Sequence, residues 1–464
     1  MLTLEENRRL TETGVGTPMG DLFRSYWQPL LLSRELGPDG EPKRLRIFGE
    51  DFIAFRNSEG KVGVVEPRCS HRGADLFFGR NEECGLRCAY HGWKFDVEGN
   101  CVDLPTSTPE IAERTKPKAA IRALQVQEYG DLVWGYLGDG IAPELPKFEF
   151  AELPASQRFV SKKFQQCNWA QAVEGGLDTA HFSYLHAAMS SGDKVSLMGK
   201  MGLNEPPSVA RYRWLVEDGM PDFTVLKHNS GLVLGASRKA DRDDLYWRIT
   251  QFMTPNHSLA PNSFPGDMCQ GNSWVPVDDH SCWIFCFAYH LERDLTDQER
   301  AQYEKGSGIF AAVDENYIPL RNRENDYLID RDRQKNLNFT GIEGISEQDA
   351  AIADSQGAAD ADADADADSL PDPEPEDSPP LIGGTRSSQR GILSSPRGSE
   401  VSPLVKIAPG WDVLPPKLKD TRYIPARRRG MAGIAKKLNE LVPRNKDCLS
   451  QHTDRPVDVW EPDE

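Results

Sequence analysis

The sequence lacks any apolar stretch approaching the roughly 20 residues that a membrane-spanning helix needs, so we expect no membrane association. The opening stretch MLTLEENRRL carries charges where a secretory signal needs an apolar run. Both absences predict a cytoplasmic, reducing environment. There, the nine cysteines are expected as thiols or metal ligands rather than as disulfides.

The sequence also lacks any excess of positive charge. Its formal net charge is −18, and half of that comes from residues 360–377, which hold nine Asp or Glu and no Lys or Arg. The remainder is mildly acidic, which argues against nucleic-acid binding. No strand is followed by a glycine-rich G-x-G-x-x-G fingerprint, so we expect no dinucleotide site on this chain.

At 464 residues the chain is long for one hydrophobic core, which predicts two domains with appendages. Residues 1–35 form a lead-in expected to pack on the body, and 36–150, rich in short β-branched and aromatic runs, a small antiparallel β domain. Residues 151–358 mix helix and strand patterns, which predicts a larger α+β domain with a central antiparallel sheet and covering helices. The acidic, Pro-rich segment 359–405 is expected to be a disordered linker, followed by a tail at 406–464.

Two cysteines and two histidines stand close together inside the smaller domain. Cys69 and His71 form Cys-x-His, and after sixteen residues Cys88 and His91 form Cys-x-x-His. Zinc accepts such ligands in a tetrahedral site. A Rieske [2Fe–2S] cluster takes two thiolates on one iron and two imidazoles on the other, and loops that each supply one Cys and one His favour the cluster.

A second cluster of candidate ligands lies in the helical stretch NWAQAVEGGLDTAHFSYLH, residues 168–186. Asp178, His181 and His186 suggest the two-His-one-carboxylate arrangement of non-haem Fe(II) oxygenases. On an unbroken helix His181 and His186 would point about 140° apart. The helix is therefore expected to bend or end between them.

These two motifs together resemble the large subunit of Rieske non-haem iron ring-hydroxylating oxygenases. CSHRGA and CAYHGWKFD are similar to their Rieske domain, and EGGLDTAHFSYLH and NFTGIEGISEQDAAIADSQG resemble the phthalate dioxygenase-like branch. The resemblance extends over residues 5–358. It implies that Cys69, His71, Cys88 and His91 hold the cluster.

The resemblance also implies roles around the mononuclear iron. His181 and His186 match iron ligands. Asp178 matches a family residue that bridges the two metal centres across a subunit boundary, which implies a homotrimer or a multiple of it. Asn168 matches an asparagine near the iron.

The third iron ligand is expected far downstream. Asp349, in ISEQDAA, matches the family's carboxylate ligand. From the residues alone, Ser346-x-x-Asp349 could equally be a capping box that starts a helix. Glu343, Glu347 and Asp354 are rival carboxylates.

The implied function is that of a terminal oxygenase component. A separate flavin-containing reductase would supply electrons from NAD(P)H, and the iron would use O₂ to hydroxylate, dihydroxylate or O-demethylate an aromatic substrate. Members of the branch favour aromatic acids, so Arg238 and Arg248 are candidates for binding a substrate carboxylate. The alternatives are a Rieske electron-transfer protein with a non-functional iron site and a zinc-stabilised binding module.

The resemblance stops after SQG, where family members continue into another helix and this chain continues into an Ala-Asp repeat. If nothing replaces that helix, the segment that carries Asp349 is expected to lose support.

Overall fold

We describe the fold from a computed structural model, which places residues 3–187, 213–241, 244–261 and 268–357. The predicted linker at 359–405 and tail at 406–464 lie outside these residues. Within the described part of the chain, no helix is long and apolar enough to cross a membrane.

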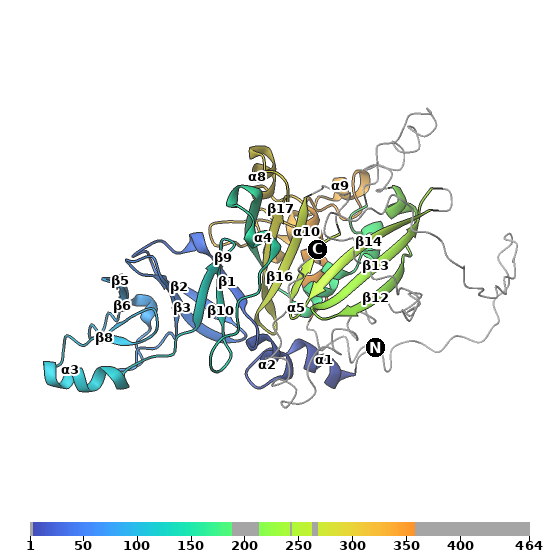
Figure 1. Ribbon diagram of the computed structural model, residues 1–464. Helices are drawn as coiled ribbons and strands as arrows, with labels where there is room; N and C mark the ends of the chain where they lie inside the picture. Colours follow the sequence, from blue (N-terminus) through green and yellow to red (C-terminus); the bar gives the residue numbers. More distant parts are fainter. Residues whose placement is uncertain (1–2, 188–212, 242–243, 262–267, 358–464) are drawn as a thin grey trace, which may run out of the picture.

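The smaller domain consists of short antiparallel strands, as predicted (Figure 1). They form sheets in the orders β1-β10-β9, β2-β3-β4 and β5-β6-β7-β8. The strands are β1 Gln28–Leu32, β2 Lys43–Ile47, β3 Glu50–Arg56, β4 Val62–Val65, β5 Arg80–Glu82, β6 Gly85–Arg87, β7 Lys94–Phe95, β8 Cys101–Asp103, β9 Gln125–Tyr129 and β10 Leu132–Tyr136. The two-residue turn between β9 and β10 has positive φ at both Gly130 and Asp131, which matches the twist of a hairpin.

The larger domain is built on one antiparallel sheet in the order β11-β17-β16-β15-β14-β13-β12. Its strands are β11 Arg158–Gln165, β12 Asp222–His228, β13 Gly231–Lys239, β14 Leu245–Met253, β15 His257–Leu259, β16 Cys269–Asp278 and β17 Ser281–Tyr289. The apolar run at the end of β17 is buried because both faces of the sheet are covered there.

Helices join and cover these sheets. The α-helices that the structure describes from end to end are α1 Leu4–Thr11, α2 Pro18–Arg24, α3 Pro109–Thr115, α4 Glu149–Glu152, α5 Trp169–Leu177, α8 Asp297–Glu304, α9 Arg331–Asn336 and α10 Ile345–Ser355. The 3₁₀ helices are η1 Ser33–Glu35, η2 Leu76–Phe78, η3 Lys116–Lys118, η4 Ala155–Gln157, η5 Ala180–Ser183 and η6 Arg323–Leu328.

The N-terminal helices pack on the larger domain. Phe23 of α2 is fully buried and meets Trp169 of α5 edge-on, with ring centroids 4.9 Å apart. Leu10 of α1 and Leu22 of α2 belong to the same buried cluster. The two helices of the lead-in thus form part of the core that holds the start of α5, while its strand β1 pairs with β10 of the smaller domain.

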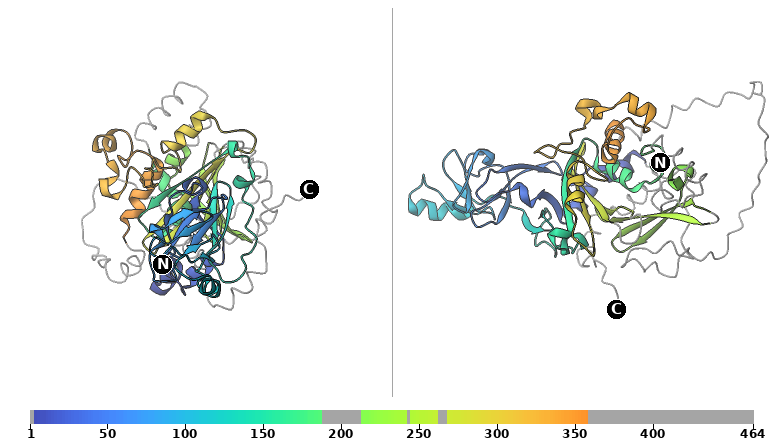
Figure 2. Two further views of the ribbon diagram at one scale, coloured as in Figure 1. Left: turned by 90° about the vertical axis from the view of Figure 1, so that its left-hand side faces the viewer. Right: turned by 90° about the horizontal axis from the view of Figure 1, so that it is seen from above.

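One face of the larger sheet lies under α5 (Figures 1 and 2). A Cβ added to Gly176 of α5 would lie 2.5 Å from the ring of Trp274 on β16, so glycine permits this close approach. Helix α10 packs beside α5, and both approach the sheet on this face. Arg248 on β14 pairs with Ala236 on β13, and Arg238 lies two residues after Ala236. Both arginines therefore point to the same face of the sheet.

Candidate metal centres

The two Cys/His loops of the smaller domain repeat one backbone geometry. In each loop the cysteine N–H donates to the carbonyl five residues later, at 2.9 Å for Cys69 and 2.8 Å for Cys88. Gly73 and Gly92 donate back to these cysteines' carbonyls at 2.8 and 3.0 Å. Both glycines have positive φ, 68° and 74°, which other residues rarely adopt. The loops therefore present their side chains in matching ways.

The four side chains of these loops lie together. Cys69 and Cys88 are buried, and the rings of His71 and His91 have centroids 4.5 Å apart. Burial, reinforced by the Cys88 thiol, raises the pKa of Cys69 to about 11, so two thiolates here need a cation. His71 stacks on Trp93, and its Nδ1 is buried with no hydrogen-bond partner among the described residues. Two cysteine sulfurs and two imidazoles, one of them with an unpartnered buried nitrogen, are the donors that a cluster of the Rieske type takes.

The second candidate group begins where α5 ends. The helix stops at Leu177, and Asp178 caps its C-terminus in an extended conformation. The short helix η5 follows and carries His181, and it ends before His186. The expected break is therefore present, and it allows the two histidines to turn toward one point.

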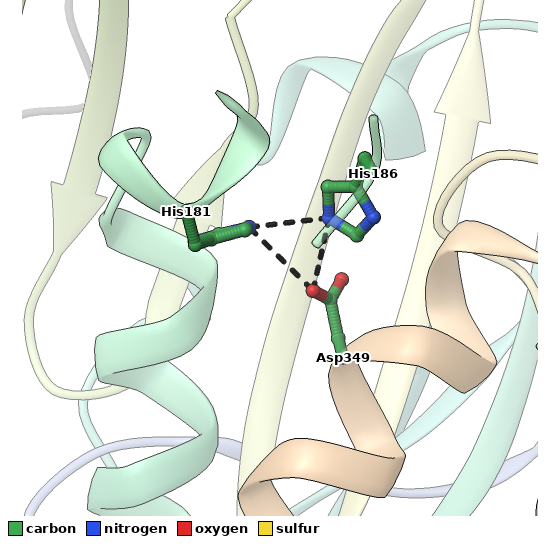
Figure 3. Close-up of side chains that lie close together, drawn as sticks. All are labelled: His181, His186 and Asp349. Atoms are coloured by element: carbon green, nitrogen blue, oxygen red, sulfur yellow. Dashed lines mark hydrogen bonds and ion pairs between the residues drawn. The ribbon is translucent and has the colours of Figure 1, made fainter. Parts of the chain in front are cut away.

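His181, His186 and Asp349 form a compact triad (Figure 3). The two Nε2 atoms lie 3.2 Å apart, and Asp349 Oδ1 lies 3.5 Å from His181 Nε2 and 3.1 Å from His186 Nε2. Adjacent ligands on an octahedral ion with bonds of about 2.1 Å lie about 3 Å apart. The triad therefore fits one face of such an ion and leaves the opposite face to other ligands.

Each histidine is oriented through its other ring nitrogen. His181 Nδ1 lies 3.3 Å from Asp178 Oδ2, and His186 Nδ1 lies 2.7 Å from Gln348 Oε1. Burial alone would raise the pKa of Asp178, but hydrogen bonds from His181 and the Ala180 N–H outweigh it and lower that pKa. Asp178 thus stays ionised and holds the Nδ1 proton of His181, which leaves Nε2 for a metal.

The pKa of His186 is raised although burial alone would lower it, because the carboxylate of Asp349 and the amide of Gln348 favour the charged ring. A metal bound to Nε2 would replace the extra proton in this position. The donor set suits a divalent cation for that reason.

Helix α10 is anchored by residues that the structure describes. Tyr327 donates a hydrogen bond of 2.5 Å to Asp354 Oδ2, and Lys163 of β11 bonds the hydroxyl of Ser346. Gln348 Nε2 donates to Ile342 O at 2.9 Å. These contacts hold the segment that carries Asp349.

The rival carboxylates point elsewhere. Glu343 is exposed and pairs with Arg321 at 2.7 Å, Glu347 accepts from the backbone N–H of Ala312, and Asp354 accepts from Tyr327. The capping-box interpretation of Ser346 and Asp349 is wrong, because α10 begins after Gly344, which has no side-chain cap. Both residues lie inside the helix.

The prediction that Asn168 lines the iron site is also corrected. Asn168 caps the N-terminus of α5, where its Oδ1 accepts from Ala170 N–H and its Nδ2 donates to the carbonyls of Thr11 and Asp279. The nine-residue helix separates it from the turn that leads to His181 by about 14 Å. Its amide is used in holding α5 to the body.

The two candidate substrate arginines differ in their surroundings. Arg238 donates to Thr179 and to the carbonyl of Asp218 and is buried. Arg248 lies with its guanidinium carbon 4.4 Å from the ring centroid of Phe182. Phe182 lies beside the rings of His181 and His186, so of the two arginines only Arg248 stacks on a neighbour of the triad.

Gln348 is a residue that the sequence pattern missed, and its replacement tests its role. Gln348→Leu removes the acceptor of His186 Nδ1–H, so we expect Fe(II) affinity to fall about 10- to 100-fold. Gln348→Glu keeps an acceptor and should lose far less. Fe(II) titration against a competing chelator measures both, and equal affinities in the two variants would contradict the role.

Comparison with known proteins agrees with this geometry. A family model of the Rieske [2Fe-2S] domain matches residues 26–129, and a model described as LigXa C-terminal domain like matches residues 135–370. The first match excludes the zinc module as the explanation of the Cys/His loops.

Relatives of known activity cover most of the chain. The 3-chlorobenzoate-3,4-dioxygenase oxygenase subunit of Comamonas testosteroni is 36% identical over 376 residues, 77% of this chain and 82% of the relative. The phthalate 4,5-dioxygenase oxygenase subunit of Pseudomonas putida is 36% identical over 360 residues, 76% and 79% of the two chains. The 5,5'-dehydrodivanillate O-demethylase oxygenase subunit of Sphingobium sp. (strain NBRC 103272 / SYK-6) is 38% identical over 292 residues, 61% and 63%.

All three relatives are named as oxygenase subunits, so a chain of this kind works with a separate partner protein. The cofactors are a Rieske [2Fe–2S] cluster and a mononuclear iron, in agreement with the Cys/His loops and the triad. The chain belongs to the Rieske non-haem iron oxygenases, as an enzyme of the ring-hydroxylating class and a large subunit of the phthalate dioxygenase-like branch.

Proposed function

We propose that this chain is a terminal oxygenase that hydroxylates, dihydroxylates or O-demethylates a carboxylated aromatic compound. The cluster is assigned to Cys69, His71, Cys88 and His91, and the iron to the triad. When bound, these groups supply single electrons and activate O₂. The convergence of the triad's ligand atoms within 4.8 Å of one another is the observation that carries the proposal.

Arg248 supports an anionic substrate. Its exposed fraction is 9%, and it stacks on Phe182, whose ring centroid lies 4.9 Å from that of His181 and 4.7 Å from that of His186. A buried positive charge thus lies one aromatic ring away from the triad. A guanidinium fork can bind a carboxylate through two parallel hydrogen bonds.

Two hydroxyls extend this polar surface along β14. Tyr246 and Thr250 lie two residues to either side of Arg248 and therefore on the same face of the strand. Both hydroxyl oxygens are buried, and neither has a hydrogen-bond partner among the residues that the structure describes. Buried polar atoms normally find a partner, so these two favour a substrate that carries polar atoms.

The relatives support the same class of substrate. Chlorobenzoate, phthalate and dehydrodivanillate, which appear in the names of the three relatives, are aromatic carboxylates. Their named reactions include dioxygenation and O-demethylation, so the acid is their common feature. We therefore place the carboxylate at Arg248 and the reacting part of the ring toward the triad.

A substrate panel tests the proposal. The purified protein, supplied with a reductase and NADH under ¹⁸O₂, is offered benzoates, phthalates and methoxybenzoates beside the matching neutral amides. We expect the acids to stimulate O₂ uptake and either to gain ¹⁸O or to release formaldehyde. If the amides react as well as the acids, the carboxylate assignment is wrong, and if no compound reacts, the oxygenase assignment is wrong.

Arg248→Gln is expected to raise KM for an acid substrate about 10- to 100-fold, because a charge-assisted hydrogen bond contributes about 1.5–3 kcal/mol. The KM of any neutral substrate should change little. Steady-state kinetics on an acid and its amide measure the difference. Lys239→Gln, at an exposed position on β13, is the control for loss of one positive charge.

Asp178, through its bond to His181, is proposed as the link between the centres of neighbouring subunits in a homotrimer. The separate partner is proposed to be a flavin-containing NAD(P)H reductase. The cytoplasmic location expected from the sequence stays a prediction.

A further inference from the structure

The guanidinium of Arg238 is buried and hydrogen-bonded to other residues of the protein. Its exposed fraction is 1%, and its Nη1 donates to Thr179 Oγ1 at 3.0 Å, its Nη2 to Thr179 O, and its Nε to Asp218 O at 3.1 Å. All three guanidinium nitrogens therefore make hydrogen bonds inside the fold. This arginine is unsuited to hold a substrate carboxylate, in contrast to the expectation from the sequence.

Thr179 lies just after the end of α5, at the start of the turn, residues 178–186, that carries His181 and His186. It follows Asp178 directly and precedes His181 by two residues. As the N-cap of η5 it makes no side-chain capping bond, and within the turn it is the carboxylate of Asp178 that accepts from the N–H groups of Ala180 and His181. The side chain and carbonyl of Thr179, which is 3% exposed, are fixed by Arg238 instead.

Through its bonds to Thr179, Arg238 joins the turn to the sheet of the larger domain; we call this pair of residues the clamp. Arg238 lies near the end of β13, whose residues Gly231–Lys239 pair with β14 on one side and β12 on the other. The carbonyl of Asp218 receives the third hydrogen bond, and the carboxylate of Asp218 accepts from the backbone N–H of Lys239 at 2.8 Å. The turn is thus tied to β13 through the two bonds from Arg238 to Thr179, and Asp218 fixes Arg238 and the end of that strand.

Burying a guanidinium lowers the stability of the fold unless its N–H donors are satisfied, and the hydrogen bonds to Thr179 and Asp218 satisfy those of Arg238. Burial lowers the pKa of Arg238 to about 10, and the group still stays charged at neutral pH. We propose that Arg238 is a positioning residue that clamps Thr179 and thereby sets the placement of Asp178 and His181. The inference rests on the proposed function only in taking His181 as a metal ligand.

The test compares substitutions at the two ends of the clamp. Arg238→Lys keeps the charge but loses the fork, and Thr179→Val keeps the shape but loses the Oγ1 acceptor. Thr179→Ser keeps the hydroxyl and serves as the conservative rescue. Arg300→Lys is the matched control, because Arg300 also donates to backbone carbonyls, those of residues 155, 156 and 158, near α8.

Co(II) added to the full-length protein, with its cluster oxidised and so silent in EPR, reports on the triad without any turnover. We expect Co(II) affinity to fall about 10- to 100-fold in Arg238→Lys and Thr179→Val, with a changed Co(II) EPR spectrum. Thr179→Ser and Arg300→Lys should keep the wild-type spectrum, even where thermal unfolding shows that they are less stable. KM for an acid substrate should stay within about twofold of the wild type while kcat falls.

Wild-type affinity and an unchanged spectrum in Thr179→Val and in any folded Arg238→Lys protein would overturn the role of Arg238. A large rise in KM restricted to acid substrates would also overturn it, since that result assigns Arg238 to the substrate. If the wild-type protein itself binds no Co(II) at the triad, the proposed iron site is wrong, and this outcome is distinct from both others.

Discussion

Asp349→Ala should abolish product formation while leaving the Rieske cluster intact. Asp349 supplies the carboxylate of the triad, 3.1 and 3.5 Å from the two Nε2 atoms. Loss of a direct ligand should lower Fe(II) affinity by more than the roughly 100-fold that loss of an outer partner can cost. Fe(II) titration and a product assay with excess Fe(II) measure the two effects.

Glu343→Gln is the matched control for this variant. Glu343 lies six residues earlier, is exposed, and makes a surface ion pair with Arg321, so its loss should cost little. The assignment of Asp349 would be contradicted if Asp349→Ala kept wild-type Fe(II) affinity. It would also be contradicted if Glu343→Gln lost the metal instead.

Asp178→Asn should lower the rate of product formation about 100-fold or more even when excess Fe(II) keeps both metal centres filled. In the native protein the N–H of Ala180 donates to Asp178 Oδ1 at 2.8 Å, and the amide of the variant keeps an oxygen for this bond. It loses the charge that holds the Nδ1 proton of His181. Because the pKa of Asp178 is lowered, the native group is a carboxylate throughout the neutral range.

Single-turnover oxidation of the reduced cluster in the presence of substrate and O₂ measures this effect. Asp332→Asn, an exposed position at the start of α9, controls for the loss of one acidic group. An Asp178→Asn protein whose cluster is oxidised at the wild-type rate would show that Asp178 does not link the centres. A protein that instead loses its iron would make Asp178 a support of His181 alone.

Short-range spacing in the sequence predicts much of this arrangement. The Cys-x-His and Cys-x-x-His loops were predictable because each fits within one tight turn around glycine. The break near His181 was predictable because helix geometry forbids two ligands five residues apart from meeting on one ion. The structure ends α5 at Leu177, earlier than a bend between the histidines requires.

The partners that orient the site could not be predicted in the same way. His186 meets Gln348 across 162 residues and Thr179 meets Arg238 across 59, so no local period relates them. Asn168 was placed at the iron from its motif, although an asparagine before a helical run is also a favoured N-cap. Three-dimensional packing decides between such roles.

Metal and sulfide analysis of the anaerobically purified, full-length protein, with EPR of the dithionite-reduced sample, tests the central claim most directly. The two centres together predict about three irons and two sulfides per chain, with the signal of a Rieske cluster. About two irons and two sulfides, unchanged after Fe(II) is added, would contradict the account and leave a cluster-only electron carrier.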